Sequence, residues 1–178
     1  MRICLYGAGS TKLNKKYLDV GYQLGAKLAQ ENHTLVFGAG SNGMMGAVAR
    51  GMHDNNGKII GIAPDWMDKF EELYDYCDKL ISTSTMDERK RLFLTNSDLF
   101  IIAPGGIGTL DEFFQIITLK KLEKHEKPII MFNIDGYYDV LMDMMNHMIK
   151  EKTISEKDIE LYEVATSIDE ILNYINTY

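Results

Sequence analysis

The sequence has little cysteine and no grouped metal ligands. Its 178 residues include two cysteines, Cys4 and Cys77, which are far apart, and four scattered histidines. Isolated cysteines without a CxxC spacing are typical of reduced, small, buried residues in a cytoplasmic protein, and not of a disulfide framework. We therefore expect neither a disulfide nor a metal site.

Long apolar runs are also missing. The opening segment MRICLYGAGS has too short an apolar stretch between Arg2 and Gly7 to serve as the core of a signal peptide. No run approaches the ~20 apolar residues that a membrane-spanning helix needs. We therefore expect a cytoplasmic protein that does not have a membrane as its partner.

Positive charge is in deficit. The chain has 19 Lys and Arg residues against 26 Asp and Glu residues, which gives a formal net charge of -7 at pH 7. Nucleic acids select basic surfaces, so this balance argues against nucleic acid as the main partner. A small anionic ligand is still compatible with it, because one local site can be positive within an acidic protein.

What the sequence does contain is a regular alternation of short apolar runs and longer helical patterns. Strands are expected at 2–6, 33–37, 58–63, 78–83, 98–103, 128–132 and 161–165. Helices are expected at 15–32, within 38–54, at 85–96, from the turn at 104–109 to Leu122, at 137–151 and at 167–178. Nearly all-apolar strands imply burial on both faces of a parallel sheet. The alternation predicts one α/β domain over residues 1–178, a doubly wound, Rossmann-like parallel sheet with helices on both faces.

The first expected helix carries one apolar stripe. Leu18, Tyr22, Gly25 and Leu28 recur at helical spacing within 15–32. This period predicts that these four residues face the core.

Three glycine-bearing turns each follow an expected strand and precede an expected helix. They lie at 6–11, 37–46 and 104–109. Glycine lets a ligand approach the backbone without a Cβ in the way, and free amides at a helix start favour a phosphate. A single glycine turn often serves only to reverse the chain. Three such turns along one edge of the sheet favour a ligand site, since ligands bind there in doubly wound folds.

The second turn contains the pattern GxGxxG at Gly38, Gly40 and Gly43. A dinucleotide fingerprint normally lies on the first βα turn and is followed by an acidic residue that closes the next strand. Here the pattern is on the second turn, and the first acidic residue after it in that region is Asp65, beyond a proline. The sequence therefore disfavours an NAD(P) site. The first turn likewise lacks the spacing of a P-loop.

Glu112, which follows the third turn, has two interpretations. Thr109 and Glu112 have the spacing of a capping box, in which each side chain satisfies a free amide at the start of a helix. Ser167 and Glu170 have the same spacing where no glycines adjoin, so capping alone is sufficient to explain the glutamate. The second interpretation is that Glu112 acts on a ligand held by the glycine turn.

Met86, Arg89 and Lys90 lie within one turn of the helix expected at 85–96. Such a run of charge usually forms a solvated surface. If this helix packs beside the following strand, however, its cations approach an anion held at 105–109. A positive group, an anion site and a carboxylate would then converge, as cleavage of a nucleoside phosphate at its glycosidic bond requires.

These segments resemble the two signature motifs of the Lonely guy family, the cytokinin riboside 5'-monophosphate phosphoribohydrolases, often labelled lysine decarboxylase-like. The motif PGGxGTxxE is matched by Pro104, Gly105, Gly106, Gly108, Thr109 and Glu112, and the motif MxxRK by Met86, Arg89 and Lys90. The similarity continues through GAGSNGMMGAVA and NIDGYYDVL and covers nearly the whole chain. The motifs are less specific for the substrate, because relatives cleave ordinary nucleoside monophosphates such as AMP.

The resemblance implies an enzyme that hydrolyses the N-glycosidic bond of a nucleoside 5'-monophosphate, without a metal or cofactor. The base would be adenine or an N6-modified adenine, and the products would be the free base and ribose 5-phosphate. The resemblance also implies a homodimer with active sites close to the subunit interface. The implied catalytic pair is Arg89 and Glu112, with Arg89 either holding the phosphate or orienting Glu112. The implied phosphate and substrate contacts are Gly40, Met86, Lys90, Gly105, Gly106, Gly108, Thr109 and Asp111.

The chain departs from the family pattern at several positions. Ala39 interrupts an expected run of three glycines, and Gly7-Ala8-Gly9-Ser10 replaces an expected Gly-Ser-Ser. Leu119 and Lys121 stand where members often have Trp and Gln. These differences make cytokinin specificity a weaker inference than phosphoribohydrolase chemistry.

Two other functions remain to be weighed. A catalytically silent nucleotide-binding or cofactor-carrier protein of the same fold would need the glycine turn, but it would not need both Arg89 and Glu112. Lysine decarboxylation would require pyridoxal phosphate and a Schiff-base lysine, and no lysine lies in a convincing cofactor pocket.

Overall fold

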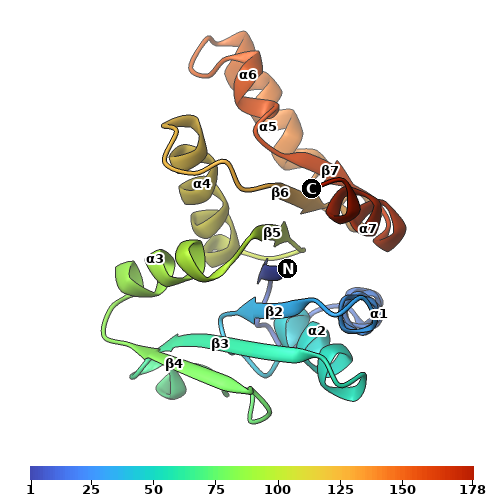
Figure 1. The fold of residues 1–178 in the computed structure, drawn as a ribbon. Coiled ribbons are helices and arrows are strands. Elements are labelled where there is room, and N and C mark those ends of the chain that lie inside the picture. The colour runs from blue at the N-terminus through green and yellow to red at the C-terminus, as the bar shows by residue number, and fades with distance from the viewer.

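The computed structural model describes residues 1–178, and one seven-stranded parallel sheet runs through it in the order β4-β3-β2-β1-β5-β6-β7 (Figure 1). The strands are β1 (Arg2–Tyr6), β2 (Thr34–Phe37), β3 (Lys58–Pro64), β4 (Lys79–Thr83), β5 (Leu99–Ile102), β6 (Ile129–Phe132) and β7 (Glu163–Ala165). All neighbouring pairs are parallel. The doubly wound fold and all seven expected strands are therefore confirmed, with shifts at their ends of one or two residues.

The helices lie on both faces of this sheet. They are α1 (Lys15–Gln30), α2 (Gly43–Asp54), α3 (Met86–Asn96), α4 (Ile107–Lys121), α5 (Asp139–Lys150), α6 (Glu156–Ile159) and α7 (Ile168–Thr177), with short 3-10 turns at Met67–Lys69 and Ile134–Gly136. Figure 1 shows α1, α2 and α7 on one face and α3, α4 and α5 on the other. Successive strand residues belong alternately to two apolar cores, one on each face of the sheet. In β1, Ile3 and Leu5 pack towards α1 and α2, whereas Cys4 and Tyr6 pack towards α3 and α4.

The strand order reverses at β1. From β1 the chain moves outward through β2 and β3 to β4, and then returns to β5 on the other side of β1. Cys4 pairs with Val36 of β2 on one side and with Phe100 of β5 on the other. The three glycine turns follow β1, β2 and β5, so they lie side by side at the carboxyl edge of the sheet, at its switch point.

The buried face of α1 differs from the expected stripe. Gly25 and Leu28 are buried as expected, but Leu18 is only partly buried, and Tyr22 is 38% exposed with its hydroxyl donating to Asp54. A Cβ on Gly25 would overlap the Val48 carbonyl of α2. Close packing of α1 on α2 therefore turns the glycine side of the helix inward, and the buried residues are Gly21, Leu24, Gly25, Leu28 and Ala29.

Two smaller features complete the fold. The short helix α6 was not expected from the sequence, and it begins with a capping box between Ser155 and Asp158. Both cysteines are free: Cys4 is buried and Cys77 is partly buried. None of the helices combines the length and the apolar character that crossing a membrane would require.

Candidate active site

A cavity of about 350 Å³ opens at the switch point, above the carboxyl ends of β1, β2 and β5. The first glycine turn lines it, together with Gly38, which directly follows β2, and Met45 of α2. Met86 and Arg89 of α3 and the first turns of α4 complete the wall. This cavity brings together most of the residues that the sequence singled out.

Helix α4 begins inside this cavity with an open end. Gly106 is its N-cap and carries no side chain that could satisfy the free amides. The first amide to find a partner within the helix belongs to Leu110, which donates to the Gly106 carbonyl. The preceding amides of the first turn therefore have no intrahelical acceptor. A Cβ on Gly106 or Gly108 would meet nothing within 4 Å, so the missing side chains leave the helix end accessible.

Thr109 does not cap α4, and the predicted capping box is wrong. The helix begins at Ile107, so Thr109 lies within its first turn. Thr109 is buried and packs on Gly105: a Cβ on Gly105 would overlap the Thr109 hydroxyl. Gly106 is the N-cap and Gly108 lies in the first turn, so the helix starts before Thr109. At α7, by contrast, Ser167 is the N-cap and accepts from the Glu170 amide at 3.2 Å. Glu112 is thus free of a capping role.

Arg89 is buried, which excludes the solvated charged surface considered for it. The residue as a whole is 6% exposed, and its Nε donates to the Ile62 carbonyl at 3.1 Å. Its Nη2 donates to the Gly38 carbonyl at 3.2 Å, and a Cβ at Gly38 would overlap that nitrogen. The backbone of β3 and of the turn directly after β2 therefore holds the guanidinium.

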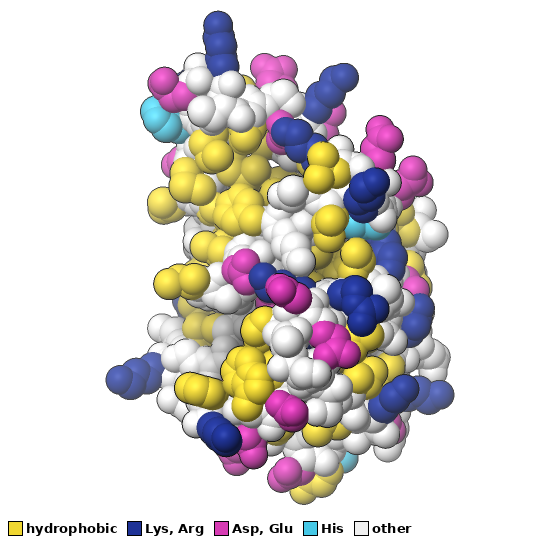
Figure 2. Space-filling model, turned by 90° about the vertical axis from the view of Figure 1, so that its left-hand side faces the viewer, with side chains coloured by type: hydrophobic (Ala, Val, Ile, Leu, Met, Phe, Trp, Pro, Cys, Tyr) yellow, Lys and Arg dark blue, Asp and Glu magenta, His cyan; other side chains and the backbone are white.

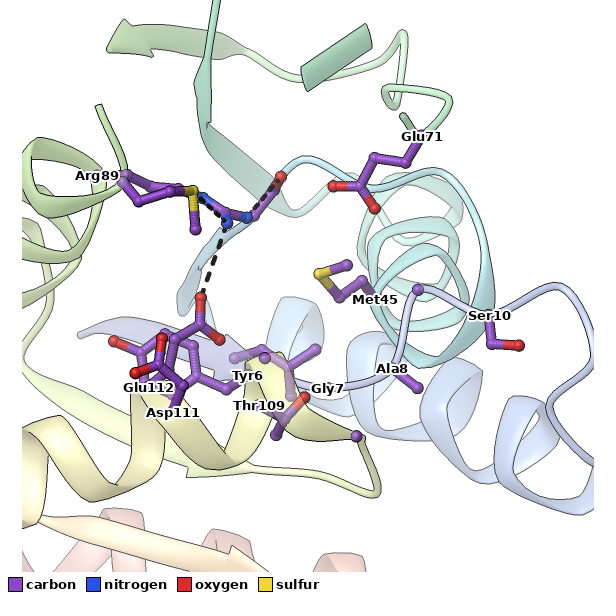
Figure 3. A pocket seen from close by; sticks show the side chains of 16 residues that line it. Tyr6, Gly7, Ala8, Ser10, Met45, Glu71, Arg89, Thr109, Asp111 and Glu112 are labelled. Atoms are coloured by element: carbon purple, nitrogen blue, oxygen red, sulfur yellow. Dashed lines mark hydrogen bonds and ion pairs between the residues drawn. The ribbon is translucent and has the colours of Figure 1, made fainter. Parts of the chain in front are cut away.

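Arg89 and Glu112 face each other inside the cavity (Figure 3). Arg89 Nη1 is 3.9 Å from Glu112 Oε1, and the two side chains are 7% and 12% exposed. This separation gives an ion pair but is too long for a hydrogen bond. Burial raises the pKa of Glu112 to about 7, and the Arg89 charge opposes that rise. A carboxyl group that titrates near neutrality in a cavity is a candidate general base.

Lys90 and Asp111 form a second contact between α3 and α4. Lys90 Nζ is 2.5 Å from Asp111 Oδ2, with the lysine largely buried and the aspartate more than half exposed. Asp111 lines the cavity, but Lys90 does not. The cation of Lys90 is therefore paired with its neighbour rather than directed at the cavity.

Comparison with known proteins shows to which family the chain belongs. A family model described as "Possible lysine decarboxylase" matches residues 45–175. The cytokinin riboside 5'-monophosphate phosphoribohydrolase LOG3 of Arabidopsis thaliana is 33% identical over 177 residues, or 99% of this chain and 82% of that protein. A probable enzyme of the same name from rice, LOGL5 of Oryza sativa subsp. japonica, is 31% identical over 99% of this chain and 72% of its own length.

The chain belongs to the Lonely guy family. Solved structures similar to it show the same fold. The molybdenum cofactor binding protein from Rippkaea orientalis has a TM-score of 0.75 at 23% identity and covers 99% of this chain and 95% of its own. The molybdenum cofactor carrier protein of Chlamydomonas reinhardtii has a TM-score of 0.75 at 20% identity, over 99% and 96%. These two likenesses concern the fold alone.

Of the site residues that the resemblance to the Lonely guy family implied, seven line the cavity and three do not. Met86, Arg89, Gly106, Gly108, Thr109, Asp111 and Glu112 are on its wall. Gly40 lies beside it and forms a bridge with Leu73, Gly105 lies beneath Thr109, and Lys90 is turned to Asp111.

Sequence reasoning missed two features of the site. Glu71, from the segment between β3 and β4, lines the cavity, although no motif or spacing marks it. Tyr137 and Tyr138 brace the third glycine turn, since their hydroxyls donate to the Gly105 carbonyl at 2.8 Å and the Ala103 carbonyl at 2.6 Å. Both tyrosines belong to the family-like stretch NIDGYYDVL, which was the only signal for them.

Proposed function

We propose that the protein hydrolyses the N-glycosidic bond of a nucleoside 5'-monophosphate and releases the free base and ribose 5-phosphate. One observation carries the proposal: an open helix end and a buried Arg89–Glu112 pair share one cavity. The names of the similar plant proteins support the same reaction class.

The 5'-phosphate binds at the start of α4. The free amides of the first turn point out of the helix end, and the helix dipole favours negative charge there. Gly106 and Gly108 leave space for the phosphate oxygens, because a Cβ at either position would occupy open space. Gly105 and Tyr137 contribute indirectly, by holding the turn in place.

Glu112 acts where the sugar meets the base. It follows the phosphate-binding turn along α4, so a nucleotide anchored at the helix end extends past its carboxylate. As the C1'–N bond breaks, the sugar becomes positively charged, and a carboxylate stabilises that charge. Glu112 also accepts a proton from the attacking water, whose oxygen bonds to C1'. The departing base nitrogen keeps the electron pair of the broken bond and takes up that proton from Glu112, which restores the carboxylate. General acid–base assistance of this kind contributes about 10²- to 10⁴-fold in rate.

Arg89 positions Glu112 and does not hold the phosphate. Its Nε and Nη2 are engaged by the carbonyls of Ile62 and Gly38, which leaves Nη1 directed towards Glu112. The positive charge favours the ionised, proton-accepting form of the carboxylate.

A second copy of the chain covers the exposed apolar face next to the site. Ile107 at the start of α4 is 89% exposed, and Val140 of α5 is 80% exposed. Val140 and Met144 are four residues apart and share one side of that helix, and the partly exposed Tyr137 lies just before its start. Apolar side chains also gather over the upper part of the face drawn in Figure 2, where α4 and α5 lie. A homodimer would bury this surface beside the active site.

Light scattering after gel filtration tests the dimer. Val140→Asp should reduce the mass from two chains to one, because a buried charge opposes association. Leu80→Asp is the control, since Leu80 is also exposed but lies on β4, the far edge of the sheet. A wild-type protein that elutes as a monomer would contradict the dimer.

Release of free base from a nucleotide panel tests the reaction. AMP, isopentenyladenosine monophosphate, GMP, CMP and UMP are incubated with the wild type and with Glu112→Gln, and products are separated by chromatography. The proposal expects base release that is lost in the variant, and the ranking of the panel distinguishes cytokinin activation from general nucleotide hydrolysis. Binding without release from any nucleotide would instead favour the carrier protein.

A further inference from the structure

A second hollow, of about 420 Å³, lies between the end of α2 and residues 74–76. It shares no lining residue with the active-site cavity. The backbone beside it is fixed, because residues 72–74 pair with residues 39–41 through two hydrogen bonds of 2.8 Å and an isolated bridge. The volume of the hollow falls within the range of small-molecule sites in proteins.

Tyr74 brings a hydroxyl group without a partner to this hollow. The residue is only 7% exposed and its ring packs edge-on against Phe37, yet it lines the hollow and its hydroxyl forms no hydrogen bond within the protein. Burial raises the pKa of Tyr74, so the hydroxyl stays protonated and able to donate. A buried polar group without a hydrogen bond is unfavourable. A ligand in the hollow would supply the missing partner.

Arg50 of α2 lines the same hollow and has donors to spare. Its Nη1 donates to the Ser41 carbonyl at 2.9 Å, which holds the guanidinium against the second glycine turn. Arg50 forms no ion pair, although Asp54 and Asp75 also line the hollow. A guanidinium only donates hydrogen bonds and a carboxylate only accepts them. A ligand that satisfies both kinds of group therefore carries acceptors as well as donors.

Two stacked rings give the hollow a flat wall. The ring centroids of His53 and Tyr76 are 4.5 Å apart, and the ring planes are inclined by 34°. Tyr76 is 62% exposed, which leaves its ring surface accessible to a ligand. Aromatic side chains of this kind stack with nucleobases, whatever the identity of the base.

The charge balance of the hollow selects against an anion. One cation, Arg50, stands against the two carboxylates of Asp54 and Asp75. Tyr22 Oη donates to Asp54 at 3.0 Å but leaves it charged. The excess of negative charge repels a phosphate group, whereas a neutral ring is not affected by it. The hollow thus differs from the start of α4, which attracts an anion.

We propose that this hollow is a second ligand site, which binds a free nucleobase or a similar neutral heteroaromatic ring. The ring stacks on Tyr76. Acceptors on its edge face Arg50 and the Tyr74 hydroxyl, and its amino group faces the carboxylates. The inference goes beyond the proposed hydrolysis, because the hollow lies outside the catalytic cavity and takes a ligand without a phosphate group.

Titration of the full-length, ¹⁵N-labelled protein with adenine, followed by nuclear magnetic resonance, tests the site. Amide shifts should be largest at residues 50–54 and 74–76, and they give the dissociation constant. Tyr76→Ala should weaken adenine binding about 5- to 150-fold, the range for stacking of a base on an aromatic side chain. Tyr74→Phe removes only the hydroxyl and should weaken binding about 2- to 10-fold. Because adenine is added and not formed, the result does not depend on whether the protein hydrolyses AMP.

Tyr178→Ala is the matched control, because Tyr178 is 61% exposed but lies at the end of the chain, outside the hollow. It should leave the dissociation constant unchanged. Benzoate, a flat anion, should bind at the same residues more weakly than adenine. Equal adenine affinity in the wild type, Tyr74→Phe and Tyr76→Ala would overturn the inference. The absence of adenine binding, shifts confined to the active-site cavity, or tighter binding of benzoate would overturn it as well.

Discussion

The Arg89 guanidinium lies so close to Gly38 that a single methyl group on Gly38 would displace it. Arg89 Nη2 donates to the Gly38 carbonyl at 3.2 Å, and a Cβ on Gly38 would overlap that nitrogen. The guanidinium can reach Glu112 only because the residue directly after β2 has no side chain. The glycine of the second turn is thus required for a contact between protein groups as well as for access to a ligand.

Gly38→Ala should therefore reduce turnover without preventing folding. The added methyl group pushes Arg89 away from Glu112, and a displacement of about 1 Å in an active site reduces the rate about 100-fold. Steady-state kinetics of Gly38→Ala and Arg89→Lys should show losses of kcat of similar size. Full activity in Gly38→Ala beside a loss in Arg89→Lys would show that Gly38 does not position the arginine.

The pH dependence of the reaction should follow Glu112. Its pKa is raised to about 7 by burial, and the base form is the active one. The value of kcat/KM should therefore rise with pH through about 7 and level off above it. Replacing Arg89 with Met removes the charge that opposes the shift, so the rise should move to higher pH. A profile that is flat between pH 5 and 9 would contradict the assignment of Glu112 as the base.

Glu112 should also lower the stability of the protein at alkaline pH. Its pKa in the folded state lies above the ordinary value of 4.5, so the folded protein binds more protons than the unfolded chain between pH 4.5 and about 7. The free energy of unfolding then falls as pH rises through this window. Glu112→Gln should be more stable than the wild type at pH 8, by up to about 3 kcal/mol, and nearly equal to it at pH 4. Urea denaturation at both pH values measures the difference, and equal curves at pH 8 would contradict it.

Tyr137 should affect substrate binding more than chemistry. Its hydroxyl holds the Gly105 carbonyl at 2.8 Å, next to the proposed phosphate site. Tyr137→Phe removes one hydrogen bond of about 0.5–1.5 kcal/mol, which predicts a rise in KM of about 2- to 10-fold with little change in kcat. Tyr22→Phe is the control, because its hydroxyl donates to exposed Asp54 away from the cavity. A reduced kcat with unchanged KM in Tyr137→Phe would contradict the positioning role.

The fold and the place of the site could be predicted because they depend on local patterns. Buried parallel strands are apolar along their length, and each glycine turn lies directly after such a strand. The family motifs added the pair Arg89 and Glu112, and the structure places these two residues face to face. The cytoplasmic location stays a prediction.

The features of the site that the sequence did not predict depend on contacts between segments distant in the sequence. The burial of Arg89 follows from its bonds to the Ile62 and Gly38 carbonyls, which are far from it in the sequence. Spacing alone could not show that the glycines before Thr109 already form the helix end, so the capping prediction was wrong. Glu71 carries no signal at all, because its place is set by the pairing of residues 72–74 with 39–41.

The central claim is tested most directly by quantifying adenine and ribose 5-phosphate from AMP, with the wild type and Glu112→Gln side by side. The account predicts equal amounts of the two products from the wild type and a rate at least 100-fold lower in the variant, in keeping with the ~10²–10⁴-fold contribution of a general base. Adenosine and phosphate as products, or no product despite measurable AMP binding, would contradict it.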